Sequence, residues 1–458
     1  LELIEEIELF NPDCSPAVLS DQRFVAKLRD HLESLRNHSF SSSVINAAIA
    51  LTLSHTPDLY YVVEVGGHPD WEIKSQLLPI LRRKVGPMRS AMIYQVFVRN
   101  FSPHGTLGEV INAFPRLRQL GVDVIYLLPI HPIGKECRKG TLGSPYAISD
   151  FRAIDPSLRD GNLSQDPVEC FREFLLLAHQ QGFKVVMDVV LNHTSPDSVL
   201  ATKHPEWFIR DNNGKPITRI PAWSDIVMFD WWSKGSFSTE LAEELIDTLV
   251  MWAKIAIDGF RCDVAPMVPL AFWRQAREAV AKINSQAWWL AETWYVHAAR
   301  KHRAEGQQVP SHAEVALVFD SIYNHDFFDH WVRMANSSQS DRDEESTRNK
   351  LQTWIALDVL QGLNLPVGAS RMRFTENHDH ERTLATCLDN ETKAGAWAAY
   401  AAFSDGPWLI YAGQEDCQRK RPNLFETDSI PWTKEFKLQP LFSSMAEIRR
   451  AHWQVFCK

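Results

Sequence analysis

The chain has 458 residues, of which 45% are hydrophobic and 23% charged, a composition typical of a globular protein with a large buried core. Its formal net charge of -9 argues against nucleic acid as a partner, because there is no basic surplus to neutralise phosphates, and a neutral or weakly charged substrate fits better. No apolar run reaches the length of a transmembrane helix, so we expect no membrane partner, and the seven scattered cysteines, which include no C-x-x-C pair, are typical of thiols in a reducing compartment.

Residues 1–87 are predicted to form a separate, mostly helical N-terminal prefix. Apolar residues at helical spacing follow the capping pair Ser20-Asp21, and Gly86-Pro87 marks the boundary between the prefix and the rest of the chain. The prefix contains no recognisable chemistry, so we expect it to pack against the main domain.

From Met88 onward, short apolar or β-branched runs alternate with longer amphipathic stretches, the pattern of repeated βα units with a parallel sheet. The apolar runs are 92–98, 122–130, 183–191, 259–264, 288–291, 317–319, 371–374 and 408–411. The expected helices include 107–120, 167–181, 239–257, 269–283 and 441–455. Eight strands is the number that a (β/α)8 barrel requires, so residues 88–458 are predicted to form a TIM barrel of the α/β class.

One connection of this barrel is too long for an ordinary βα loop. Residues 194–230 are rich in Pro, Trp, Asn and Gly, and we interpret them as a small subdomain inserted after the third strand. At its end, Trp231 and Trp232 either line the substrate or stabilise the insert, and the sequence favours neither.

The fourth strand ends in a cation and a carboxylate on one face. Arg261 and Asp263 are two residues apart, so on a strand they point the same way, while Cys262 faces away and is expected to be a packed thiol. The fixed charge of Arg261 would keep Asp263 ionised in a poorly solvated pocket. An ionised, oriented Asp can attack a sugar carbon, although a structural ion pair is the alternative if this stretch is taken alone.

Other strand ends also carry polar side chains. The third strand ends in Asp188, Asn192 and His193, where the histidine could bind a substrate hydroxyl and the other two could hold neighbouring groups; taken alone, a buried Asp and a satisfied His are the better account. The fifth ends in Glu292, flanked by apolar and aromatic residues that raise a carboxyl pKa, as a general acid requires.

The seventh strand supplies a third carboxyl group, Asp379, beside His378. Catalytic groups of a barrel lie at the C-terminal ends of its strands, so the three carboxyl groups should converge, and two of them about 5 Å apart would make a retaining glycosidase. In that chemistry Asp263 attacks the anomeric carbon and Glu292 protonates the leaving oxygen and then activates water. Asp379 and His378 hold ring hydroxyls and favour a distorted, oxocarbenium-like sugar.

These four segments, in this order and on these strands, resemble the four signature regions of the α-amylase family of glycoside hydrolases. The match runs over about residues 92–412. The resemblance implies that Asp263 is the nucleophile, Glu292 the acid/base and Asp379 the stabiliser of the transition state. It further implies substrate-binding roles for His193, Arg261 and His378, support of the pocket by Asp188 and Asn192, and stacking of Tyr146, in Ser144-Pro145-Tyr146, on the sugar at the cleaved position.

The chain departs from the family pattern just after the nucleophile. Many α-amylases place a Lys-His pair there, which contacts the sugar beyond the cleaved bond and, through a backbone carbonyl, a calcium ion; this chain has Pro266-Met267. We therefore expect no cofactor or metal to be required for the chemistry, and the departure argues against the structural calcium, although Asn192 remains a potential ligand. The β-sandwich that typically follows the barrel in this family is also expected to be missing from the sequence that ends at Lys458.

We therefore expect a retaining enzyme that cleaves internal α-1,4 bonds of starch-like α-glucans. An α-glucosidase or an α-glucan transferase would carry the same motifs, because these enzymes share the glycosyl-enzyme intermediate and differ in the acceptor that reaches it. A non-catalytic carbohydrate-binding or assembly member is the alternative of another class. That alternative predicts the loss of one or more of the carboxylates, and all three are present.

Overall fold

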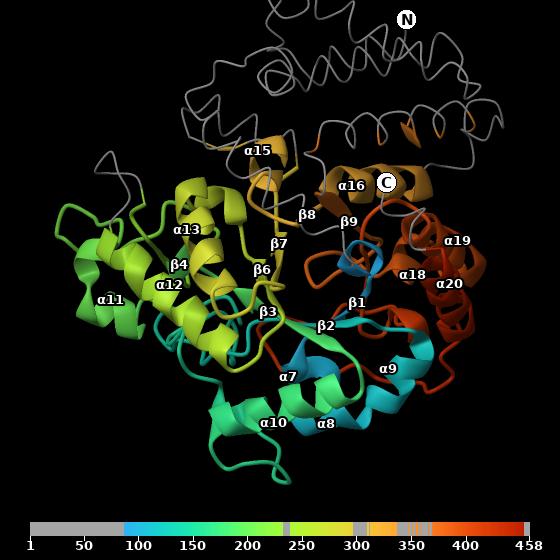
Figure 1. The fold of residues 1–458 in the computed structure, drawn as a ribbon, viewed down its shortest axis with the longest axis horizontal. Coiled ribbons are helices and arrows are strands. Elements are labelled where there is room, and N and C mark those ends of the chain that lie inside the picture. Colours follow the sequence, from blue (N-terminus) through green and yellow to red (C-terminus); the bar gives the residue numbers. More distant parts are fainter. Residues whose placement is uncertain are drawn as a thin grey trace, which may run out of the picture.

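The computed structural model describes residues 87–231, 239–295, 309–310, 312–336 and 369–452, together with the single positions 348, 351, 354, 355, 358 and 365. The predicted helical prefix therefore lies outside the described residues, apart from its last position. Within the described part, helices surround a closed barrel (Figure 1). No helix of that part is long and apolar enough to cross a membrane.

The barrel consists of eight parallel strands in the order β1-β10-β9-β8-β7-β6-β3-β2, which confirms the predicted TIM barrel. The strands are β1 Met92–Val96, β2 Val124–Leu127, β3 Lys184–Val189, β6 Gly259–Cys262, β7 Trp288–Ala291, β8 Ser321–Tyr323, β9 Ser370–Phe374 and β10 Trp408–Tyr411. Two short strands, β4 His193–Thr194 and β5 Val227–Met228, pair antiparallel within the long connection after β3. That connection also contains α11 Val199–Lys203 and the 3-10 helix η4 Pro205–Trp207.

The remaining helices lie outside the barrel and follow the predicted pattern in most places. They are α7 Val98–Phe101, α8 Leu107–Asn112, α9 Phe114–Leu120, α10 Pro167–Gln180, α12 Thr239–Lys254, α13 Leu270–Ala281, α15 His312–Ala316, α16 His325–Asn336, α18 Thr383–Thr386, α19 Glu391–Ala402 and α20 Gln439–Ala451. The single helix predicted over 107–120 is wrong. The helix breaks at Ala113 because Pro115 has no amide hydrogen to continue the ladder of α8 and lies instead in the first turn of α9.

The sixth strand also lies elsewhere than predicted. Residues 317–319 end the turn of α15, where Phe319 N donates to Val315 O at 3.0 Å, and the strand is Ser321–Tyr323. Phe319 packs between helix and sheet against Trp273, with ring centroids 5.4 Å apart, so its apolar side chain is buried although it is not part of a strand. The short apolar run therefore correctly indicated buried residues, but these residues do not form the strand.

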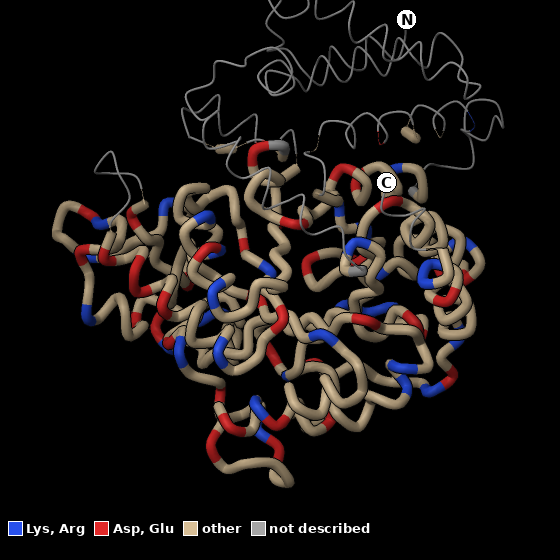
Figure 2. Tube along the Cα trace, in the orientation of Figure 1, with Lys and Arg blue, Asp and Glu red and all other residues tan. Residues whose placement is uncertain are grey.

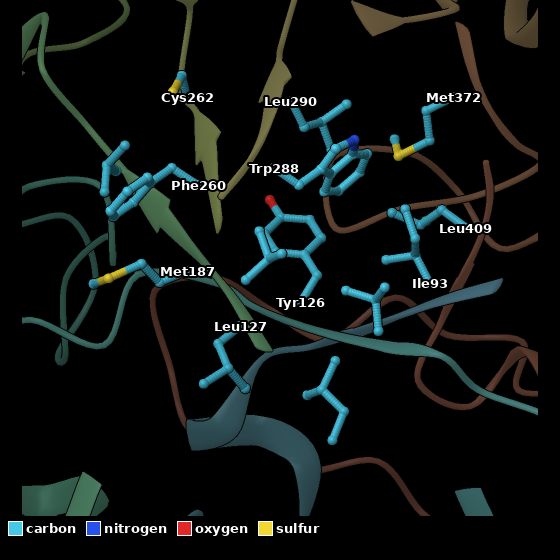
Figure 3. Close-up of a cluster of buried hydrophobic side chains, with 14 of the residues drawn as sticks. Ile93, Tyr126, Leu127, Met187, Phe260, Cys262, Trp288, Leu290, Met372 and Leu409 are labelled. Carbon is cyan, nitrogen blue, oxygen red and sulfur yellow. The ribbon is translucent and has the colours of Figure 1, made fainter. Parts of the chain in front are cut away.

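The core joins the inner faces of the strands to the apolar faces of the helices. Figure 3 shows buried side chains from several barrel strands gathered in one cluster, including Ile93, Tyr126, Met372 and Leu409. A Cβ added at Gly259 would lie 2.2 Å from Trp288 O, so only glycine allows β6 and β7 to approach at this point. Trp231 is buried and donates to Leu191 O at 3.2 Å, the stabilising alternative of the two predicted for it, whereas Trp232 lies outside the described residues.

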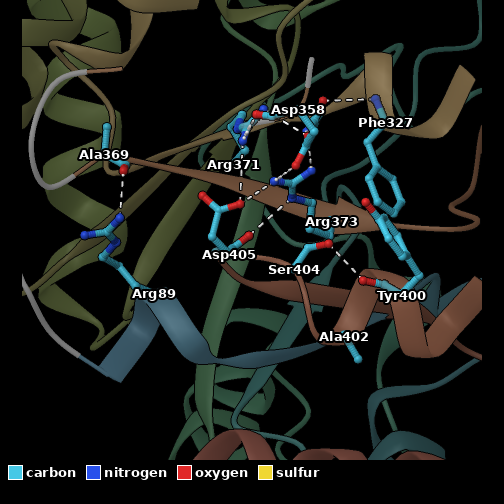
Figure 4. A network of polar contacts seen from close by, with 12 residues as sticks. Arg89, Phe327, Asp358, Ala369, Arg371, Arg373, Tyr400, Ala402, Ser404 and Asp405 are labelled. Atoms are coloured by element: carbon cyan, nitrogen blue, oxygen red, sulfur yellow. Dashed lines mark hydrogen bonds and ion pairs between the residues drawn. The ribbon is translucent and has the colours of Figure 1, made fainter. Parts of the chain in front are cut away.

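A buried ion cluster anchors β9 from outside the site (Figure 4). Arg373 Nη2 donates to Asp358 Oδ2 at 2.9 Å, Arg371 Nη1 lies 3.1 Å from Asp358 Oδ1, and Arg373 also pairs with Asp405. Burial opposes the charge of Asp405, but the two arginines outweigh it and lower the pKa of Asp405 to about 2. Elsewhere along the described chain, positive and negative residues are interspersed (Figure 2).

Candidate active site

The predicted polar residues gather at the C-terminal rim of the barrel. Asp188 and Arg261 are register partners on β3 and β6, and Asp263 and Glu292 directly follow β6 and β7. His378 and Asp379 follow β9. Because all the strands are parallel, these ends meet on one rim, and ion pairs or hydrogen bonds join every one of these residues to a neighbour.

Arg261 is the hub of the site. Its side chain is fully buried, and it pairs with three carboxylates: Asp188 Oδ1 at 2.9 Å and Asp263 Oδ1 at 2.7 Å from Nη1, and Glu292 Oε1 at 2.9 Å from Nη2. Burial opposes its charge, but Asp188 and Glu292 outweigh burial and raise the pKa of Arg261 above its ordinary value. The guanidinium is therefore a permanent cation that holds the two predicted catalytic carboxyl groups side by side.

The expectation that Arg261 keeps Asp263 ionised is not supported. Burial raises the pKa of Asp263 well above its usual range, the negative charge of Glu292 raises it further, and the attraction of Arg261 only partly offsets them. The attraction of Arg261 is insufficient to offset burial and Glu292 because the one cation is divided among three carboxylates. Asp263 therefore retains its proton to a higher pH than a separate aspartate would.

Glu292 is held at both of its oxygens. While Oε1 faces Arg261, Oε2 accepts the backbone N–H of Val264 at 2.8 Å. Val264 has φ 37° and ψ 45°, a left-handed conformation that is strained for a β-branched residue. This turn, directly after Asp263, aims an amide at the carboxyl group of the next strand. A valine at position 264 gives no indication in the sequence of this left-handed turn.

His378, Tyr146 and Asp379 form the opposite wall of the site. The rings of Tyr146 and His378 stack, with centroids 5.4 Å apart, and His378 Nε2 lies 2.6 Å from Tyr146 Oη and 3.1 Å from Asp379 Oδ2. Burial, with a smaller effect of Arg261, lowers the pKa of His378 to about 3, so its imidazole is neutral near pH 7. The side chain of Asp379 is 46% exposed, against 9% for Asp263, so it is the carboxylate most open to a ligand.

His193 and Asn192 join this pocket to the long connection after β3. His193 is buried against the ring of Trp223, with centroids 5.5 Å apart, and burial lowers its pKa to about 4. Asn192 Nδ2 lies 3.4 Å from His193 Nδ1, and Asn192 O accepts the N–H of Phe229 at 3.0 Å. Asn192 therefore contacts both His193, a predicted substrate-binding residue, and Phe229, the residue that follows β5.

Two polar residues of the site escaped prediction because they lie inside apolar strand runs. Tyr126, on β2, donates its hydroxyl to Asp188 Oδ2 at 2.7 Å. Gln95, on β1, is fully buried, with its Nε2 2.9 Å from His378 Nδ1. The only signal available was an amide or a hydroxyl within an otherwise apolar run, because burying either is unfavourable without a partner.

A lysine pairs with a carboxylate of the long connection that follows Asn192 in the chain. Asp225 Oδ1 is already neutralised by Lys139 Nζ at 2.8 Å, and the same ammonium donates to Ala222 O at 2.7 Å. Among the described residues, no group of three His, Cys, Asp or Glu side chains is placed to hold a metal ion.

Comparison with known proteins places these observations in a family. Residues 74–235 match the model described as Alpha amylase, catalytic domain. An α-amylase structure from Lactobacillus plantarum is 37% identical, with a TM-score of 0.70 over 79% of this chain and 80% of that one. Neopullulanase 2 from Thermoactinomyces vulgaris is 27% identical over 395 residues, 74% of this chain and 59% of the relative.

A maltosyltransferase is also among the relatives. The α-1,4-glucan:maltose-1-phosphate maltosyltransferase of Myxococcus xanthus is 31% identical over 281 residues, 54% of this chain and 40% of that protein. The chain thus spans less than two thirds of the length of these two curated relatives.

Proposed function

Since the chain belongs to the α-amylase family of glycoside hydrolases, we propose that it cleaves α-1,4-glucosidic bonds of starch-like α-glucans through a covalent glycosyl-enzyme intermediate. The observation that carries the proposal is the pairing of Asp263 and Glu292 across one guanidinium. Adjacent carboxyl groups suit a retaining mechanism, whereas an inverting mechanism needs a wider gap that admits a water molecule.

In the first step, an oxygen of Asp263 bonds to the anomeric carbon while the bond from that carbon to the leaving oxygen breaks. Asp263 Oδ1 is bound to Arg261, so we assign the attack to Oδ2. The leaving oxygen takes a proton from Glu292. In the second step Glu292 removes a proton from water, the water oxygen attacks the same carbon, and Asp263 departs as a carboxylate.

The other side chains bind and orient the sugar. Asp379 and His378 are assigned to ring hydroxyls and to the positive charge that develops on the ring, Tyr146 to stacking on the sugar face, and His193 to a hydroxyl on the side of the insert. Asp188 holds Arg261 and the Tyr146 hydroxyl in place.

Transfer to a second sugar is the alternative that one observation favours. Met267 packs against the apolar cluster Ala147, Ile226 and Met228, and its turn borders Glu292, where Ala265 N donates to Glu292 O at 3.2 Å. The turn after Asp263 therefore carries the apolar pair Pro266-Met267 where many family members place a Lys-His pair. Such an apolar turn holds water less firmly, which would allow an acceptor sugar to compete for the intermediate.

Maltoheptaose distinguishes these reactions. We expect mid-sized fragments in the first turnovers, with the newly formed reducing ends in the α configuration by proton NMR. Glucose as the first product would favour an exo-acting enzyme, and chains longer than the substrate would indicate transfer. A β-configured first product would contradict the retaining mechanism, and no turnover of any α-glucan would contradict the proposed function.

The raised pKa of Asp263 predicts a displaced pH profile. Asp263 must be ionised to attack, so kcat/KM falls as the pH decreases through its pKa, and burial and Glu292 place that pKa above the ordinary Asp range. Glu292→Gln removes the negative charge that Glu292 carries when it is ionised, and it should move the acid limb to lower pH. The measurement uses α-maltosyl fluoride, whose leaving group needs no proton. An acid limb that stays in place, or moves up, would mean that Glu292 does not repel the charge of Asp263.

A further inference from the structure

Gln95 brings an amide into the interior of the barrel, directly beneath the site. It is fully buried on β1, and its register partners are Tyr126 on β2 and Tyr411 on β10. Its Nε2 lies 2.9 Å from His378 Nδ1, a contact between residues 283 positions apart in sequence. Its Oε1 has no hydrogen-bond partner among the described residues. Burying an amide costs free energy unless its polar atoms are hydrogen-bonded, and the contact with His378 supplies the hydrogen bond of Nε2.

The hydrogen bonds on the far side of His378 fix the direction of this contact. Tyr146 has a single hydroxyl proton, and Asp188 Oδ2, which accepts when ionised, lies 3.0 Å from it. Because Tyr146 donates its one hydrogen bond to Asp188, Tyr146 Oη accepts a hydrogen bond from His378 Nε2, 2.6 Å away. Asp379 Oδ2, 3.1 Å from the same nitrogen, is a second acceptor. Nε2 therefore carries the hydrogen of the neutral imidazole, and Nδ1 presents a lone pair.

We propose that Gln95 is a positioning residue that sets the tautomer of His378, because its N–H donated to Nδ1 keeps the ring hydrogen on Nε2. There it faces Tyr146, Asp379 and a sugar hydroxyl. The result is one directed series of hydrogen bonds that runs from Gln95 through His378 and Tyr146 to Asp188, which also accepts from Arg261. Only the step to a sugar hydroxyl rests on the proposed function.

The tautomer matters because Asp379 is exposed and has few other anchors. An Nε2 lone pair in place of an N–H would repel the carboxylate of Asp379 and leave the Tyr146 oxygen without a donor. The carboxylate that we assign to the developing positive charge would then shift. Second-layer hydrogen bonds of this kind typically contribute about 10- to 100-fold to a function that depends on the orientation of a histidine.

Two substitutions separate tautomer control from packing. Gln95→Met has nearly the same length but no donor, so it weakens the preference for the Nε2-protonated tautomer, which then rests on Tyr146 and Asp379 alone. Gln95→Glu has nearly the same shape but, when ionised, only accepts, so it draws the hydrogen to Nδ1. We expect kcat/KM on maltoheptaose to fall by about 10-fold in Gln95→Met and by about 100-fold in Gln95→Glu. The matched control is Gln414→Met, which removes another buried rim amide, one that donates to Thr375 Oγ1 at 2.7 Å.

The ring nitrogens report the tautomer without any substrate. In protein labelled with ¹⁵N-histidine, with the His378 signals identified by their loss in His378→Asn, we expect a protonated Nε2 in the wild type and in Gln414→Met. We expect a larger Nδ1-protonated fraction in Gln95→Met than in the wild type, and a protonated Nδ1 in Gln95→Glu. A wild-type His378 protonated at Nδ1, or a Gln95→Met variant with unchanged tautomer and unchanged kcat/KM, would overturn the proposal. Because the NMR signal needs no turnover, failure of the proposed function alone would leave it intact.

Discussion

Asp263→Asn is expected to reduce α-glucan turnover by at least about 10⁴-fold, because an amide cannot form the glycosyl ester and removal of a catalytic nucleophile has effects of this size or larger. The stability of the fold should not decrease. A group whose pKa is raised by folding opposes stability as the pH rises above its unfolded pKa, and Asp263 is such a group. We therefore expect a Tm at pH 7 that is equal to or higher than that of the wild type, with the turnover lost.

The control for this variant lies at the other end of the same strand. Asp258 pairs with His179 Nε2 at 2.6 Å and Lys184 Nζ at 2.8 Å, and although burial opposes it, these partners lower its pKa. Its carboxylate therefore stabilises the fold above its unfolded pKa. Asp258→Asn should lower the Tm at pH 7 and retain turnover, the reverse of Asp263→Asn. Turnover that survives in Asp263→Asn would refute the mechanism.

Glu292→Gln is expected to reduce turnover of maltoheptaose by about 10²- to 10⁴-fold, the usual range for loss of a general acid and base. Formation of the intermediate from α-maltosyl fluoride should be much less affected, because fluoride leaves without a proton. Hydrolysis of the intermediate still needs the base, so the glycosyl-enzyme should accumulate. Mass spectrometry should locate the adduct on Asp263, and added azide should release an α-maltosyl azide.

Another buried carboxyl group at the rim provides the comparison for Glu292. Glu376 accepts from Arg382 Nη1 at 2.6 Å and from Thr383 N at 2.6 Å, and these contacts hold the segment that carries His378 and Asp379. Glu376→Gln should affect glucan and fluoride substrates by the same factor. If Glu292→Gln also reduced the turnover of both substrates by the same factor, the assignment of Glu292 as the general acid would be wrong.

Local pattern sufficed for the barrel and for the candidate residues. A strand buried on both faces is an apolar run whatever surrounds it, and the C-terminal ends of parallel strands share one rim, so Asp263, Glu292 and Asp379 could be assigned to a common site before their distances were known. The prediction failed where residue type was ambiguous. The short β8 strand carries Ser321 and Tyr323, while the apolar run before it belongs to a helix end.

By itself, then, the sequence determined the fold and which strand ends carry reactive groups, because both follow from hydrophobic period and from position along the chain. Only the tertiary structure decided how those groups affect one another. It buries Asp263 beside Glu292, and these two effects outweigh the shared charge of Arg261 and reverse the expected pKa direction of Asp263. It also aims Val264 N–H at Glu292 and Gln95 at His378. These effects depend on distances of about 3 Å between residues far apart in the chain, and electrostatic and hydrogen-bond energies change steeply over such distances.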